Sequence, residues 1–165
     1  MRVFIEKQRF NQWWLYAIYI LVLAILITAI YKNSDGFINF HSPILVLLLL
    51  IAFIPMGFIL YMQLETRIDN EGISLKFLPL GFSKKSFSWK EIDECYVRKY
   101  NPFVEYGGWG IRGSSRRKVY NVSGYLGIQI VTKDKKKFLI GTQKPDAARA
   151  VLKHYQHKKL KTSEK

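Results

Sequence analysis

Residues 73–77, ISLKF, decide the fold of the larger part of this chain. Three apolar side chains, Ile73, Leu75 and Phe77, alternate with two polar ones in this stretch. Successive side chains of a β-strand point to opposite faces of a sheet, so this period of two predicts a strand with one buried face. The turn-forming residues 69–72, DNEG, stand directly before it. The pattern therefore predicts short antiparallel strands separated by tight turns.

The same alternation continues further along the chain. It recurs in 86–89 (SFSW), 94–100 (ECYVRKY), 127–132 (GIQIVT) and 137–141 (KFLIG). The polar residues 133–136, KDKK, predict a turn between the last two segments. We expect about six or seven strands in total, each with one buried face.

A different period marks the C-terminal segment 144–159, KPDAARAVLKHYQHKK. Pro145 suits the first position of a helix, and Asp146 suits the positive end of the helix dipole. Apolar residues then recur three and four positions apart, which predicts one apolar stripe on an amphipathic helix. The stripe comprises Ala147, Ala148, Val151, Leu152 and Tyr155.

Two uncharged apolar stretches, 13–31 and 44–62, precede the alternating region. As helices they would be roughly 28 Å long, close to the ~30 Å hydrocarbon thickness of a bilayer. Neither has the polar face expected of a helix in a water-soluble core. The two stretches therefore predict a transmembrane hairpin, and the alternative of two buried core helices is disfavoured.

The distribution of charge predicts how such a hairpin is oriented. The chain carries a net charge of +14, and most of its lysines and arginines follow the second apolar stretch. The N-terminal tail is also basic, whereas the connecting loop has one lysine and one aspartate. Because positive charge stays on the cytoplasmic side, we expect a multi-pass inner-membrane protein with both termini cytoplasmic. A single cysteine, Cys95, suits a reducing compartment.

These patterns predict the domain organisation. Residues 1–12 form a cytoplasmic tail, 13–62 the membrane hairpin with a short external loop, 63–158 a cytoplasmic domain and 159–165 a basic tail. The expected fold class is a membrane α-hairpin followed by a mainly-β domain, in which a bent antiparallel sheet or barrel is capped by one C-terminal helix.

Four segments resemble a known family. They are Trp89-Lys90-Glu91-Ile92, 106–112 (YGGWGIR), 120–124 (YNVSG) and 140–145 (IGTQKP). Together they are similar to the bacterial pleckstrin-homology-like membrane proteins of unknown function, many of which carry a membrane hairpin ahead of the domain. The resemblance covers residues 64–155 and extends to the hairpin. It implies a pleckstrin-homology-like fold and no particular activity, since a fold does not carry its function with it.

The glycine-rich stretch 106–113, YGGWGIRG, has two interpretations. Its backbone amides and Arg112 could hold an anion such as a lipid phosphate, with Trp109 at the membrane interface. Alternatively, Gly107, Gly108 and Gly110 adopt backbone angles closed to other residues. The sequence favours this structural loop, because no Gly-Lys-Ser/Thr follows as in a phosphate-binding loop.

Basic clusters supply the remaining candidate binding residues. We expect some of them to contact anionic headgroups of membrane lipids, although a charge run is also typical of a solvated face. The candidate set is Trp109, Arg112, Arg116, Arg117, Lys118, Lys84 and Lys85. Further clusters are Arg98-Lys99, Lys133 with Lys135 to Lys137, and Lys153 with Lys158, Lys159 and Lys161.

No catalytic residue, metal site or cofactor is predicted. His154 and His157 lie three positions apart without Cys or carboxylate residues at ligand spacing, and His41 lies in the connecting loop. Cys95 on a strand is expected to be a small buried residue rather than a nucleophile.

The sequence therefore predicts a non-enzymatic, membrane-anchored binding or scaffold module, engaging a protein partner, an anionic lipid or both. Exposed strand edges and the flank of the C-terminal helix are the expected docking surfaces. One alternative is an accessory subunit that docks into a membrane-protein complex through its hairpin. Contact with nucleic acid or the ribosome is a remote alternative, because no helix-turn-helix or ribonucleoprotein motif is present.

Overall fold

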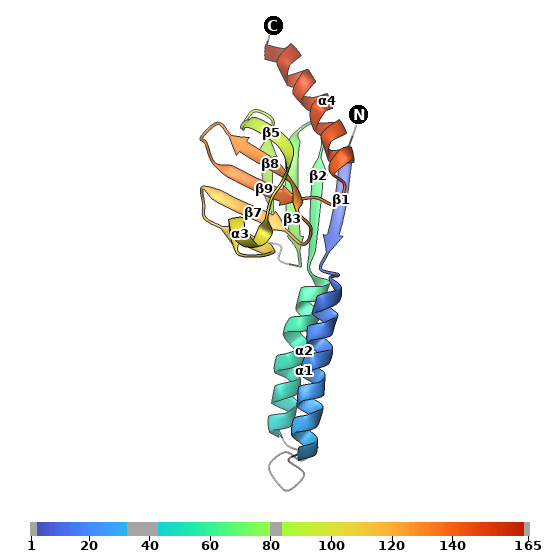
Figure 1. Cartoon of the computed structure of the whole chain (residues 1–165). Coiled ribbons are helices and arrows are strands. Elements are labelled where there is room, and N and C mark those ends of the chain that lie inside the picture. The colour runs from blue at the N-terminus through green and yellow to red at the C-terminus, as the bar shows by residue number, and fades with distance from the viewer. Residues whose placement is uncertain (1–2, 33–42, 80–83, 164–165) are drawn as a thin grey trace. The chain divides into compact units, whose positions relative to one another are not determined.

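The computed structural model describes residues 3–32, 43–79 and 84–163 (Figure 1). The chain divides into two compact units. Residues 10–61 form the helical unit, and residues 1–9 and 62–165 together form the sheet unit. The elements in order are β1 (Phe4–Arg9), α1 (Trp13–Lys32), α2 (Pro43–Tyr61), β2 (Gln63–Ile68), β3 (Gly72–Leu78), β4 (Lys85–Ser88), β5 (Ile92–Lys99), α3 (Pro102–Tyr106), β6 (Gly110–Gly113), β7 (Arg117–Asn121), β8 (Leu126–Thr132), β9 (Lys137–Gly141) and α4 (Pro145–Ser163).

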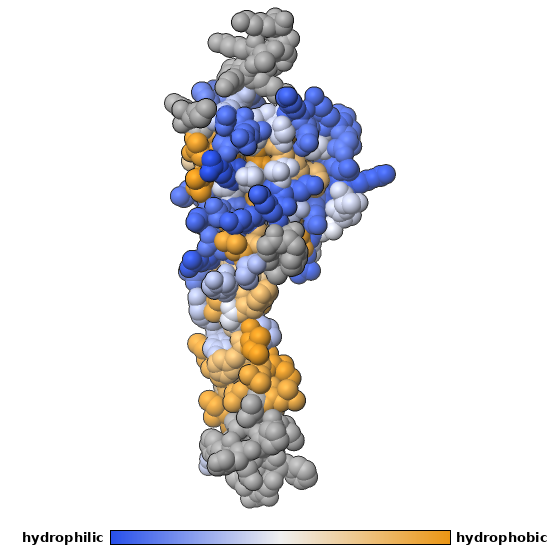
Figure 2. Space-filling view, turned by 180° about the vertical axis from the view of Figure 1, so that it is seen from behind, coloured by the Kyte–Doolittle hydropathy of each residue, from blue (hydrophilic) through white to orange (hydrophobic). Residues whose placement is uncertain are grey.

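The helical unit consists of α1 and α2, which contact each other through aromatic side chains. The rings of Tyr19 and Phe53 meet edge to face, with centroids 5.1 Å apart and planes at 89°. Tyr16 donates a hydrogen bond of 2.8 Å to the side chain of Asn11, just before α1. Much of the described surface of this unit is apolar, and Figure 2 shows it in orange.

The prediction of a transmembrane hairpin is contradicted. Within the described residues, no helix combines the length and the hydropathy that crossing a membrane requires. The same finding contradicts the predicted multi-pass inner-membrane location, and with it the predicted orientation of the two termini. The predicted external loop, including His41, lies outside the described residues.

Two β-sheets make up the sheet unit. The first has the strand order β1-β2-β3-β4 and is antiparallel throughout. The second has the order β5-β8-β9-β7-β6 and is mixed, because β7 runs parallel to β9. The predicted fold class is therefore wrong in its sheet as well as in its hairpin. The parallel pair of β7 and β9 means that the sheets are not antiparallel throughout. Residues 1–12, which were expected to form a tail, contain strand β1.

Strand β1 stands before the helical unit in sequence yet belongs to the first sheet. It pairs antiparallel with β2 over its whole length, from Phe4 opposite Ile68 to Arg9 opposite Gln63. Both ends of the helical unit therefore join neighbouring strands of one sheet.

Alternating side chains from both sheets form the core of this unit. The residues of β3 follow the predicted pattern, since Ile73, Leu75 and Phe77 are all at most 2% exposed. Burying each such side chain contributes about 1.5–3 kcal/mol relative to exposing it. The two sheets meet where the rings of Phe87 on β4 and Phe138 on β9 pack with centroids 4.7 Å apart.

Helix α4 begins at Pro145, which confirms the predicted start. Its buried side chains are Ala148, Val151, Leu152 and Tyr155, whereas Ala147 of the predicted stripe is exposed. Tyr155 stacks on Trp89 with ring centroids 5.2 Å apart. The helix also lies against β5, where the side chain of Gln156 donates a hydrogen bond to the carbonyl of Cys95.

Polar side chains on β1 tie this strand to the second sheet. Glu6 and Gln8 are 3% and 1% exposed, although both residue types are usually found on the surface. The Glu6 carboxylate accepts hydrogen bonds from the Thr142 hydroxyl at 2.6 Å and the Gln143 N–H at 2.7 Å. Gln8 donates to the carbonyl of Gly141 at 2.7 Å. The segment before the helical unit is thereby anchored to the β9–α4 junction.

Removing the Glu6 carboxylate is expected to destabilise the fold. Glu6→Ala leaves the Thr142 hydroxyl and the Gln143 N–H without their acceptor at a site closed to water, which costs about 2 kcal/mol or more. Glu65→Ala is the matched control, because its contacts with Lys7 and Lys76 are exposed and 3.9 and 3.8 Å long, worth less than about 1 kcal/mol. Urea unfolding followed by tryptophan fluorescence measures both. Equal losses in the two variants would contradict the anchoring role.

Candidate functional site

A pocket of about 440 Å³ opens beside β4 and the β8–β9 turn. Its walls come from three short segments that are distant in sequence: β4 itself, the turn that follows it, and the β8–β9 turn with the start of β9. The lining residues are Lys85, Ser86, Phe87, Lys90, Glu91, Thr132, Lys133, Asp134, Lys136 and Phe138. We name it the lysine pocket.

Two aromatic rings form the apolar part of the lysine pocket. Phe87 is 3% and Phe138 is 6% exposed, and their rings pack against each other where the sheets meet. The ammonium of Lys85 lies 5.9 Å from each ring centroid. At this distance a cation is attracted to the face of an aromatic ring, which holds Lys85 at the mouth of the pocket.

Positive charge exceeds negative charge around the lysine pocket. Four lysines and two carboxylates line it, which leaves a net charge of 4 − 2 = +2. The Lys136 ammonium lies 2.6 Å from the Asp134 carboxylate, and Thr132 donates a second hydrogen bond to it. The contact with Lys136, followed by that with Thr132, lowers the pKa of Asp134 to about 2, so this carboxylate is ionised at neutral pH and offsets Lys136.

The other three lysines of the pocket have no such partner. Within the described residues, no carboxylate lies within ion-pair distance of Lys85, Lys90 or Lys133. Like charges that converge on a cleft with a low-dielectric wall reinforce one another's field. The lysine pocket is therefore a place where an anionic group gains attraction from several directions.

Backbone hydrogen bonds fix the two turns that carry these lysines. The N–H of Lys133 in the β8–β9 turn donates to the carbonyl of Glu91 in the β4–β5 turn at 2.9 Å. The β8–β9 turn is closed by Thr132 and Lys136 at 3.0 Å, and Lys135 adopts a positive φ of 61° within it. The ammonium of Lys135 lies 2.9 Å from Asp93 and does not line the pocket. The lysine pocket is thus held by backbone contacts between separate turns.

The structure separates the binding residues expected from sequence. Of these, Lys85 lines the lysine pocket, and the exposed Lys84 precedes it at the start of β4. The others lie on the β6–β7 hairpin and the segment before it. Those residues are Trp109, Arg112, Arg116, Arg117 and Lys118.

The side chains on that hairpin contact nearby groups of the same unit. Trp109 packs edge to face on Phe103 with centroids 4.7 Å apart, and Arg112 donates to the Trp109 carbonyl at 3.4 Å. The Lys118 ammonium lies 5.7 Å from the ring centroid of Tyr120. The sequence placed Lys133 and Lys136 in a further basic cluster, but it did not select Lys90, which lies in the β4–β5 turn.

Glycines in the stretch 106–113 shape the backbone around α3. Asn101 caps the start of this helix, accepting hydrogen bonds from the N–H groups of Phe103 and Val104. Gly107 ends it in the left-handed conformation, with φ of 74°, and its N–H bonds back to the helix. Gly108 and Gly110 follow with φ of 126° and 111°, angles that residues with a side chain rarely adopt. This geometry explains the glycines without a bound anion.

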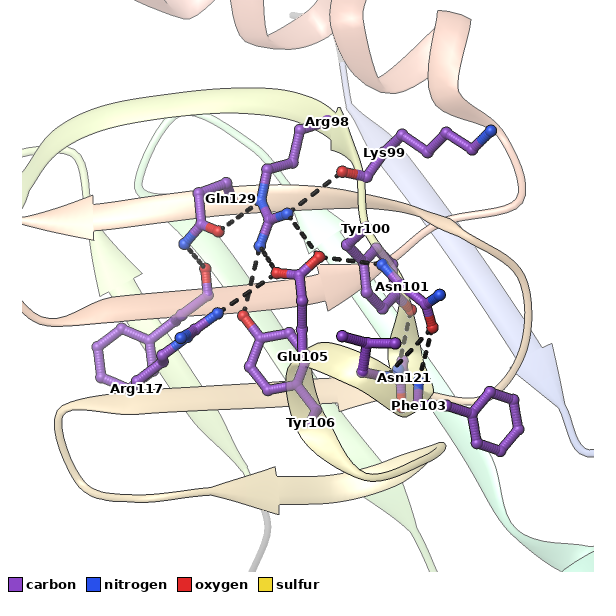
Figure 3. Close-up of polar contacts among 12 residues, drawn as sticks. Arg98, Lys99, Tyr100, Asn101, Phe103, Glu105, Tyr106, Arg117, Asn121 and Gln129 are labelled. Atoms are coloured by element: carbon purple, nitrogen blue, oxygen red, sulfur yellow. Dashed lines mark hydrogen bonds and ion pairs between the residues drawn. The ribbon is translucent and has the colours of Figure 1, made fainter.

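An arginine–glutamate network fastens α3 to the second sheet (Figure 3). Arg98 on β5 meets the Glu105 carboxylate with two nitrogens, at 2.7 and 3.2 Å. The same guanidinium donates to Gln129 on β8 at 2.9 Å. Arg117 adds a contact of 3.4 Å to Glu105 and lies 5.1 Å from the ring centroid of Tyr106. Arg117 is therefore engaged internally, which lowers its value as a ligand-binding residue.

Cys95 and His154 are the described side chains that the sequence raised as possible reactive groups. Cys95 is 3% exposed, as expected of a small buried residue, and burial raises the pKa of its thiol to about 12. The thiol is therefore protonated at neutral pH and is a poor nucleophile. Within the described residues, no three His, Cys, Asp or Glu side chains converge to hold a metal ion. His154 is exposed, and the side chain of His157 lies outside the described residues.

No protein-family model matches the chain, and no curated protein matches it. The resemblance to bacterial pleckstrin-homology-like membrane proteins rested in part on a membrane hairpin, which the described helices contradict. That assignment is therefore corrected, and the function must be argued from the geometry of the chain itself.

The arginine–glutamate network predicts a dependence of stability on pH. The hydrogen bond from Arg98 lowers the pKa of Glu105 below its usual 4.5. A depressed carboxyl pKa stabilises the fold above the unfolded-state value, and this contribution is lost as pH falls through the folded-state pKa. Glu105→Gln should lower the free energy of unfolding by about 1–2 kcal/mol at pH 7, with the difference from the natural chain shrinking below pH 4.5.

Denaturant unfolding between neutral and acidic pH measures this difference. Glu71→Gln is the control, because its exposed side chain has no ion pair within the described residues. It should be nearly neutral at every pH. A gap between Glu105→Gln and the natural chain that stays constant down to the lowest pH would contradict the ionic origin.

Proposed function

We propose that the sheet unit is a non-enzymatic binding module that holds an anionic group of a protein partner in the lysine pocket. The observation that carries this proposal is the convergence of Lys85, Lys90 and Lys133 around two packed aromatic rings. Carboxylate and phosphate oxygens are the groups that ammonium donors bind best. The aromatic floor adds apolar surface for the carbon chain that carries the anion.

A protein partner fits this site better than nucleic acid. Proteins that track a nucleic-acid strand present basic residues along an extended groove, because the phosphates repeat along the backbone. Here the basic residues converge on one pocket at the edge of a sheet. Such a site suits one or two carboxylates of an acidic segment, with the net charge of +14 speeding the encounter.

Charge reversal inside the pocket tests the proposal. The probe is a fluorescein-labelled eight-residue peptide of alternating glutamate and threonine, bound to the full chain and followed by fluorescence anisotropy. Lys90→Glu combined with Lys133→Glu should weaken binding at least about tenfold, because two attractive contacts become repulsive. Raising the salt concentration should weaken binding to the natural chain by screening.

A matched pair of substitutions separates the pocket from overall charge. Lys99→Glu combined with Lys153→Glu makes the same change in net charge at two exposed positions that do not line the pocket. This control should weaken binding less than about twofold. Equal losses in both double variants would overturn the proposal. Tighter, pocket-dependent binding of a single-stranded oligonucleotide would overturn it in favour of nucleic acid.

A further inference from the structure

The outer edge of β4 lies directly beside the lysine pocket. β4 is the last strand of the first sheet, and no described strand pairs with its other side. Ser86 and Phe87 line both the lysine pocket and a second hollow of about 300 Å³ over the β3–β4 pair. A strand edge with hollows beside it is a kind of surface on which extended peptides are bound.

The orientation of the β4 backbone follows from its pairing with β3. In an antiparallel pair, alternate residues exchange hydrogen bonds with the neighbouring strand, and the residues between them point to the other edge. Trp89 donates its N–H to the carbonyl of Glu71, opposite it in register. Hydrogen-bonded pairs recur at every second residue, so Phe87 and Lys85 also form backbone hydrogen bonds with β3. Ser86 and Ser88 therefore direct their backbone groups to the open edge.

The close approach of Gly72 to β4 agrees with this orientation. A Cβ atom added to Gly72 would lie 2.0 Å from the carbonyl oxygen of Phe87. That carbonyl therefore points toward β3 and away from the open edge. Within the part of the chain that the structure describes, no strand pairs with the N–H and C=O of Ser86, which lie at the rim of the lysine pocket.

We propose that the pocket's partner is an extended acidic segment that adds to the outer edge of β4 as a further strand. This inference rests on the proposed function and specifies how the anionic group arrives. Side chains on neighbouring strands lie about 4.5–5.5 Å apart between Cβ atoms on one face. Acidic side chains of the added strand that share a face with Lys85 would therefore lie over the lysine pocket.

Electrostatic repulsion between lysines favours an acidic segment over a second copy of this chain as the strand that pairs with β4. Lysines on an exposed edge discourage pairing with another strand of like charge, and a second copy of this chain would bring the same Lys84 and Lys85 to the interface. An acidic strand reverses that repulsion. The edge of β5 is less available, because the side chain of Gln156 on α4 already donates to the Cys95 carbonyl there.

A proline at Ser86 tests the strand pairing. Ser86→Pro removes the N–H that points to the open edge, and proline is tolerated where an edge N–H faces solvent. It should weaken binding of the glutamate–threonine peptide to the full chain at least about tenfold. Ser86→Ala keeps the N–H and should therefore bind the peptide at least about fivefold more tightly than Ser86→Pro. If the proline and alanine variants bind alike, with unchanged thermal unfolding, strand addition is overturned.

Methylated peptides give the same test without altering the protein. Alternate N–H groups of an extended peptide point to opposite edges, so two peptides are made, N-methylated on all glutamates or on all threonines. At least one should bind about tenfold more weakly than the unmethylated peptide. If neither does while Lys90→Glu with Lys133→Glu still weakens binding at least about tenfold, the pocket is retained and strand addition is overturned. If the lysine variants bind normally, the proposed function itself fails.

Discussion

The contact between Phe87 and Phe138 is the interaction on which the candidate site depends. It joins β4 of the first sheet to β9 of the second, with ring centroids 4.7 Å apart. Through it, lysines separated by tens of positions in sequence come to one pocket. The rings also exclude water from one wall, and charges beside a low-dielectric wall interact more strongly than charges in open solvent. The aromatic pair therefore both assembles the site and strengthens it.

A second constraint explains how the chain accommodates its helical unit. The unit is inserted between β1 and β2, whose nearest ends pair as Arg9 opposite Gln63. An insertion whose ends meet at neighbouring positions leaves the host sheet intact. The buried Glu6 and Gln8 then fix β1 to the β9–α4 junction, so the strand that comes first in sequence is held from two sides.

The sequence predicted the local features of the sheet unit and missed those set by distant contacts. Strand β3 and the start of α4 at Pro145 were predictable, because period and end signals are local. Strand β1 was not, since its buried face includes Glu6 and Gln8, which read as surface residues. The parallel pairing of β7 with β9 likewise has no local signature. Apolar composition led to two predicted membrane spans that the described helices do not support.

In the candidate site, too, the sequence identified local features and missed those that depend on contacts between distant residues. Lys85 and Lys133 were each selected from a basic cluster, whereas Lys90 was not. Lys90 and Lys133 lie on separate turns, which a backbone hydrogen bond from Lys133 to Glu91 brings together. Conversely, the sequence offered Arg117 as a candidate binding residue, but in the fold its guanidinium forms an ion pair with Glu105. Charge clusters along a chain therefore identify which residues are basic, whereas the tertiary structure decides which of them remain available to a ligand.

Hydrogen–deuterium exchange of the full chain, with and without the acidic peptide, tests the central claim most directly. The account predicts slower exchange on peptide binding in the segments 84–92 and 131–139, which carry the outer edge of β4 and both lysine-bearing turns. Protection confined to residues 107–118, the glycine-rich stretch and the β6–β7 hairpin, would contradict it and place the binding surface where Arg112 and Lys118 lie.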